Sequence, residues 1–472
     1  TRPPWMALLA SSLALRVLRD FCLQQEGNNN GGQYCASPSR SVVPIPAAQV
    51  LRVVSTCGIV GWHSLGNCGH ARECPFDWNS IELQVVSSSL VVMTDIFFIL
   101  SAYLVVTKEV YSCRASMFVA DSAAAVLRRV LRTTPSFVLA GSIANPHSIW
   151  VLLMDCWPGI LFGIDWPFGK PLSWPFGVEL LCLVVLQILV ACRVLAGSLT
   201  ASAAAVTLLA GCLERYRRAG PEALAAAPLG RQVTAYEAWL AAHLAVGAHR
   251  LPLCLTTVLF AWTLQAVFGH SECKGALGKL GLAAGWAASA AGIAAAAFTE
   301  WLWSHGPRVI LPWWFYPFLG KVPLVIGCVF LLEVSRRCSA IRSGDGGCQL
   351  PSAWAMLERR SLGVLVLHEL VESRIMHFLP DHKRDLTMFW FQLPAVLVWS
   401  WVAASVLLWV EEPLRWALNK GLGAVHQCAR NDSVEGHAAV PALVCLVLCA
   451  LGLACFAVTR VCAEPWPSPC LL

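Results

Sequence analysis

The chain has 472 residues, of which 57% are apolar and only 13% are charged, and its mean hydropathy is +0.62. A soluble domain of average composition is about 45–50% apolar and about 25% charged. The composition therefore excludes an ordinary cytosolic enzyme, a disordered regulator and a nucleic-acid-binding protein. The formal net charge is +6, and the basic residues fall in short connections between apolar segments, as in cytoplasmic loops of membrane proteins. The first prediction is a multi-pass integral membrane protein.

The N-terminal part, residues 1–49, is predicted to be a loop or linker. The chain begins at Thr1, and its apolar stretch 5–18 is too short to span a bilayer and is interrupted by Arg16. We therefore expect a truncated or processed start. Asparagines and glycines at 28–32 and prolines further on predict irregular structure up to the first apolar segment.

The rest of the chain is predicted to be an all-α bundle of transmembrane helices. A spanning helix needs roughly 20 predominantly apolar residues, and eleven segments meet or approach that length. The main transmembrane domain is expected at 50–420, and a loop, a final helix and a tail at 421–472. The segments are 50–67, 84–107, 133–154, 174–192, 196–213, 250–268, 279–302, 309–333, 361–379, 389–411 and 439–459.

Loop composition predicts the orientation and the packing of these helices. Loops 108–132 and 334–360 are rich in arginine and are predicted to lie on the cytoplasmic side, whereas the basic loop 214–235 falls on the other side in the same arrangement. The Gly- and Ala-rich stretch 281–298 predicts close helix packing rather than a site.

The 21 cysteines contain no C-x-x-C pair, which argues against zinc ribbons, thioredoxin-like chemistry and iron–sulfur clusters. Cys68 and Cys74 share one polar loop and could form a disulfide if that loop faces an oxidising lumen. The sequence also has no nucleophile elbow, P-loop, dinucleotide glycine motif or H-E-x-x-H.

Ionisable residues inside apolar segments are costly in lipid, and each is a candidate functional residue. Arg52 and His63 are eleven residues apart, so a helix would place both on nearly the same face, about 16 Å apart. Asp95 is flanked by apolar residues and needs a partner, for which a His or Arg on a neighbouring helix is expected. A structural histidine at the membrane interface and a purely structural ion pair are the alternatives.

Three further places combine charge with apolar sequence. Arg129 and Arg132 form a basic patch at a helix entering the membrane, suited either to phosphate or to anchoring. Glu179 follows Trp174 in an apolar helix, where the acid could serve a site or an interhelical hydrogen bond. His368 and Glu412 lie late in the chain, and each could equally be structural.

The ordered set of these motifs resembles the acyltransferase 3 family, in its nose-resistant-to-fluoxetine-like branch. The second-helix signature D-x-F-F-x-L-S-G is matched from Asp95 to Ser101, with Ala102 in place of the glycine. Arg52 and His63 are similar to the first-helix pattern, and R-x-x-R-x-x-P is matched at 129–135. The acidic helix is matched at Trp174 and Glu179, the late histidine helix at His368, and the terminal E-x-P loosely at Glu412. Two family tyrosines and a glutamine are replaced by Leu362, Leu365 and Leu181.

The resemblance implies an acyltransferase that moves an acyl group from acyl-CoA, as co-substrate, to a hydroxyl acceptor of unknown identity. It implies His63 as general base, with Asp95 holding its imidazole, and no metal or other cofactor. It also implies substrate-binding roles for a second group of residues, and membrane lipids as partners. That group is Arg52, Ser101, Arg129, Arg132, Trp174, Glu179, His368 and Glu412. The expected location is the endoplasmic reticulum or the plasma membrane.

Two other classes of function remain open on the sequence. A lipid or small-molecule transporter would use His63, Asp95 and Glu179 as a proton relay without covalent chemistry. A scaffold without catalytic activity would account for the replaced family residues.

Overall fold

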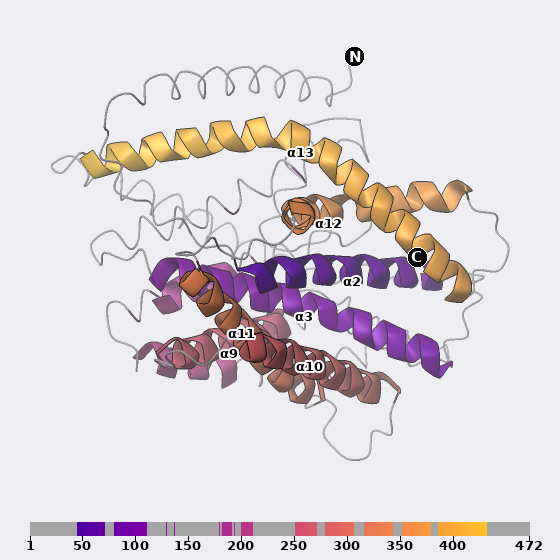
Figure 1. The fold of residues 1–472 in the computed structure, drawn as a ribbon, viewed down its shortest axis with the longest axis horizontal. Coiled ribbons are helices and arrows are strands. Elements are labelled where there is room, and N and C mark those ends of the chain that lie inside the picture. Colours follow the sequence, from indigo (N-terminus) through magenta and orange to yellow (C-terminus); the bar gives the residue numbers. More distant parts are fainter. Residues whose placement is uncertain are drawn as a thin grey trace, which may run out of the picture. The chain divides into compact units, whose positions relative to one another are not determined.

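The computed structural model is helical wherever it describes regular structure. It describes residues 45–70, 80–110, 182–190, 200–210, 251–270, 279–305, 316–342, 352–378 and 386–431, together with positions 129, 136, 179 and 193. No strand occurs within these ranges, which confirms the all-helical expectation. Figure 1 shows the labelled helices.

Seven long helices carry most of the described chain. They are α2 (Pro46–His70), α3 (Ile81–Val110), α9 (Leu251–His270), α10 (Lys279–His305), α11 (Tyr316–Arg342), α12 (Ser352–Phe378) and α13 (Leu386–Asn431). The predicted linker therefore ends within the first turn of α2, and the predicted boundary at 420 falls inside α13.

The chain divides into two compact units, which we describe separately. The first comprises Thr1–Ser41, Cys113–Leu181 and Val402–Leu472, and the second comprises Val42–Ser112 and Cys182–Trp401. The second unit contains α2, α3, α9, α10, α11, α12 and the first part of α13.

Three of the described helices are long and apolar enough to cross a membrane. They cover Ile81–Leu104, Leu280–Leu302 and Phe389–Trp409. Large apolar side chains are exposed on the last of these, including Trp390, Phe391, Val398 and Trp399, as expected of a surface that faces lipid. These helices support membrane association, whereas the predicted spans 133–154 and 439–459 lie outside the described residues.

Local sequence explains where α2 and α3 begin. Pro46 occupies the first helical position of α2, where its missing N–H costs no hydrogen bond. Ser80 caps α3, since its Oγ accepts a hydrogen bond from the backbone N–H of Leu83 at 3.4 Å. Glu82 in the first turn complements the helix dipole.

Small residues allow α10 and α11 to pack with their backbones close together, as the Gly- and Ala-rich stretch predicted. A Cβ added at Gly292 would lie 2.6 Å from the carbonyl oxygen of Pro323 and 2.8 Å from the Cα of Leu324. At Gly285 it would lie 3.1 Å from the Cα of Leu331. The facing residue on α11 has a lower number for Gly292 than for Gly285, so the two helices are antiparallel.

The same reasoning fixes the directions of α2, α3 and α11. Gly58 packs on Met93 and Gly61 on Leu90, so α2 and α3 are antiparallel neighbours (Figure 1). Between α3 and α11, Asp95 contacts Lys321 and Tyr103 contacts Glu333. Both numbers rise together, so α3 and α11 run in the same direction and their C-terminal ends lie at the same end of the unit.

Candidate functional site

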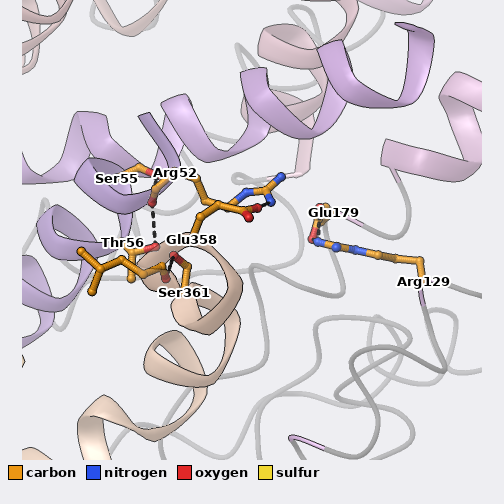
Figure 2. A network of polar contacts seen from close by, with 8 residues as sticks. Arg52, Ser55, Thr56, Arg129, Glu179, Glu358 and Ser361 are labelled. Carbon is orange, nitrogen blue, oxygen red and sulfur yellow. Dashed lines mark hydrogen bonds and ion pairs between the residues drawn. The ribbon is translucent and has the colours of Figure 1, made fainter. Parts of the chain in front are cut away.

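Two contacts between a basic and an acidic side chain join α2 to α12 in one register. Arg52 contacts Glu358, and His63 contacts Glu369 (Figure 2 shows the first pair). Each acid follows its partner by 306 positions, so the eleven-residue spacing on α2 is repeated on α12. Eleven residues are close to three helical turns, about 16 Å along the axis. The two helices therefore run in the same direction, and one face of α2 carries both basic groups toward α12.

His63 lies in a cluster of side-chain nitrogen and oxygen atoms around its contact with Glu369. Its Nδ1 is 3.1 Å from Oε1 of Glu369, and the side chains of His63 and Glu369 are 15% and 6% exposed. Because a carboxylate only accepts hydrogen bonds, Nδ1 carries the proton, which leaves the lone pair on Nε2. The ring of Trp62 meets that of His63 edge-on, with centroids 5.0 Å apart.

His368 is buried directly beside His63. The centroids of the two imidazole rings are 5.0 Å apart. Nδ1 of His368 is 2.9 Å from the carbonyl oxygen of Leu365 and must donate to it, so Nε2 of His368 holds the lone pair. Within the described part of the chain this Nε2 has no hydrogen-bond partner. The site thus contains two imidazole lone pairs and a carboxylate.

Asp95 has partners other than the histidine expected for it. Lys321 on α11 donates a hydrogen bond to Oδ1 of Asp95, and the hydroxyl of Thr257 on α9 donates to the same oxygen at 3.4 Å. The register of α2 on α3 explains why His63 is not the partner. It places Asp95 opposite Thr56, seven residues or about 10 Å along the axis from His63. The predicted His63–Asp95 pair is therefore replaced by His63–Glu369 and Lys321–Asp95.

A further charged group joins the ends of α3 and α11. Glu333 accepts a hydrogen bond from the hydroxyl of Tyr103 at 2.7 Å. It also accepts from Nε of Arg336 at 3.0 Å and from Nε of Arg337 at 2.8 Å. This carboxylate is 4% exposed and joins the end of α3 to the basic sequence that follows it on α11.

The other predicted site residues are spread over both units. In the first unit Arg129 forms an ion pair with Glu179 (Figure 2), which joins a predicted phosphate ligand to a predicted site acid. Glu412 is half-buried on α13, and its neighbour Glu411 is buried. In the second unit Ser101 is half-buried on α3.

Three predicted residues lie outside the described ones. Arg132, Trp174 and Cys74, the last of them half of the disulfide considered above, are not placed.

Sequence reasoning missed Glu358 and Lys321, and it singled out Glu369 beside His368 without predicting its contact with His63. A signal existed for the two acids, because Glu358 and Glu369 repeat the eleven-residue spacing of Arg52 and His63. Lys321 was visible as a single cation inside the predicted span 309–333.

Comparison with known proteins gives no match: no protein-family model, no curated protein and no solved structure is significantly similar to this chain. The case for a function therefore depends on the residues and geometry of the sites themselves.

Proposed function

We propose that the protein is an integral-membrane acyltransferase that moves an acyl group from acyl-CoA to a hydroxyl acceptor. The contact between His63 and Glu369 is the observation that carries this proposal. A histidine whose Nδ1–H is held by a carboxylate presents Nε2 as a base, and its imidazolium is stabilised as it forms. The sequence resemblance assigns His63 the same role, although it pairs the histidine with Asp95.

The proposed reaction needs one proton carrier. Nε2 of His63 accepts the proton of the acceptor hydroxyl while the oxygen attacks the thioester carbonyl. The tetrahedral intermediate then breaks its carbon–sulfur bond, and the CoA thiolate takes the proton from the imidazolium. Glu369 stays ionised throughout and acts as a positioning residue. General acid–base catalysis of this kind contributes about 10²–10⁴-fold to the rate.

The donor site is the part of the proposal that depends most on the resemblance. It assigns the CoA phosphates to Arg129 and Arg132. Arg129 is paired with Glu179, but a guanidinium has five N–H donors and can hold a carboxylate and a phosphate at once. Roles for Ser101 and Trp174 in substrate binding remain predictions.

The test is release of CoA from radiolabelled acetyl-CoA and palmitoyl-CoA by purified protein in lipid nanodiscs, with membrane lipids as the acceptor pool. His63→Ala should abolish release, and Glu369→Gln should reduce kcat by about 10²–10⁴-fold. Glu358→Gln is the matched control, because it removes the other carboxylate of the same helix pair and should leave kcat unchanged. Full activity of folded His63→Ala would refute the mechanism.

A second candidate function is transport of a lipid or small molecule. The observation that favours it is the ion pair between Asp95 and Lys321, because Asp95 lies within the apolar segment Ile81–Leu104 of α3. Ionisable groups at such positions often form proton or substrate pathways. Movement of substrate across a vesicle membrane without CoA release, and its loss in Asp95→Asn, would favour this function over acyl transfer.

A further inference from the structure

We propose that His63, His368 and Glu369 form a binding site for one first-row divalent metal ion of the Zn²⁺ kind. Each residue offers one ligand atom, and the three atoms lie within 4.8 Å of one another. They come from two helices, α2 and α12, and the separate Arg52–Glu358 contact has the same register. The metal site itself does not depend on the proposed acyl transfer.

The buried nitrogen of His368 is the observation that points to a ligand. His368 is 2% exposed, and its Nε2 has no hydrogen-bond partner within the described residues. A buried polar atom without a partner destabilises the folded protein, because it has lost its hydrogen bonds to water. A lone pair on this atom can be satisfied only by a donor or by a cation.

The other nitrogen of His368 is arranged as in a metal ligand. Metal-binding histidines donate their second ring N–H to a carboxylate or a backbone carbonyl, which fixes the tautomer and the ring orientation. Nδ1 of His368 makes such a bond to Leu365. The ring is therefore held in the tautomer that presents Nε2 to the cluster.

The ligand set identifies the class of ion. Two imidazoles and one carboxylate are the protein ligands of many catalytic zinc sites, which keep a fourth position open. Imidazole nitrogen disfavours Mg²⁺ and Ca²⁺, which prefer oxygen ligands. Tetrahedral ligand atoms about 2.0–2.1 Å from zinc are about 3.3 Å apart. The three ligand atoms lie within 4.8 Å of one another. Side-chain rotations that shorten the longest of these distances by at most about 1.5 Å would therefore bring the atoms to the separation that zinc requires.

Metal binding and base catalysis compete for the same histidine. Zinc would replace the proton on Nδ1 of His63, the nitrogen that faces Glu369. The remaining ring proton would then lie on Nε2, which could no longer accept the proton of a hydroxyl. If the proposed function holds, an ion at this site blocks acyl transfer, so free Zn²⁺ acts as an inhibitor competing for His63. This consequence rests on the proposed function, whereas the site does not.

The test measures metal binding directly, on the full chain in nanodiscs stripped with chelator. Equilibrium dialysis against Zn²⁺ with elemental analysis should give one tightly bound ion per chain, lost in His63→Ala and in His368→Ala. Glu369→Gln should weaken binding, and Glu358→Gln should retain it. Circular dichroism and gel filtration verify that each variant is folded.

A second measurement uses the wild type alone, in case a variant fails to fold. Co²⁺ should bind at the same stoichiometry, give the intense visible absorption of tetrahedral nitrogen and oxygen ligands, and be displaced by Zn²⁺. No stoichiometric ion in the wild type, or an ion retained by folded His368→Ala, overturns the metal site. A bound ion in the wild type, with no CoA release even after a chelator has removed that ion, would support the site and count against the acyltransferase.

Discussion

The pair formed by Asp95 and Lys321 should be a major local contribution to stability. The side chains of Lys321 and Asp95 are 8% and 16% exposed, so neither charge is well hydrated without the other. Removing one partner of a buried ion pair costs about 3–5 kcal/mol, because the remaining charge stays buried. Asp95→Asn keeps the shape but leaves the ammonium of Lys321 uncompensated, and should lower the free energy of unfolding by about 3 kcal/mol.

The assay is unfolding of the purified protein in mixed detergent and SDS micelles, followed by circular dichroism. The double variant Asp95→Asn, Lys321→Met should be more stable than Asp95→Asn alone, since no charge is left unpaired; coupling energies for residues in contact are about 0.5–3 kcal/mol. Glu82→Gln, an exposed acid on the same helix, should change stability by less than about 0.5 kcal/mol. The single variant Lys321→Met completes the comparison. If the effects of Asp95→Asn and Lys321→Met on the free energy of unfolding add up to the effect of the double variant, the pair contributes no coupling energy and the reasoning is refuted.

Three further predictions concern packing, register and orientation. Gly292→Ala should destabilise the protein by about 1–3 kcal/mol in the same unfolding assay, since its Cβ would lie 2.6 Å from facing backbone; an unchanged transition would contradict the packing of α10 on α11. Exchanging the charges in Arg52→Glu, Glu358→Arg should restore part of the stability that either single change removes, and failure to do so would argue against the register of α2 and α12. Cysteines introduced at Ile81 and at Ala353, both exposed, should react with an impermeant thiol reagent from opposite sides of a sealed vesicle, as peptide mass mapping would show; labelling from the same side would contradict the helix directions.

The helices could be predicted from the sequence because apolar runs are a local signal. The segments expected at 84–107 and 279–302 correspond to α3 and α10, both long and apolar enough to span a membrane. The Gly- and Ala-rich stretch 281–298 predicted close packing, and the facing backbone of α11 supplies it. In these cases the sequence pattern and the structural consequence lie within one helix.

The partners of the site residues could not be predicted, because they depend on the register between helices. The sequence suggests that Asp95 should accompany His63, but a shift of seven residues along the axis separates them. Neither α2 nor α3 alone sets that shift, which depends on how Gly58 and Gly61 of α2 pack against Met93 and Leu90 of α3. The acid that contacts His63 comes from α12, about 300 residues later.

The helix directions raise a specific requirement for the proposed reaction. α3 and α11 end together, next to the arginine-rich sequence predicted to be cytoplasmic, and α2 begins at that end, where the N–H of Ala47 donates to Ser335 Oγ at 3.2 Å. His63 lies seventeen residues after Pro46, about 25 Å along the axis, which approaches the thickness of a hydrocarbon core of about 30 Å. A donor that enters from the basic end must therefore carry its thioester most of the way across the bilayer to meet the base. Asp95 and Lys321 lie at a depth between the basic end and His63. In an acyltransferase this pair would therefore face the path of the donor rather than the reacting atoms.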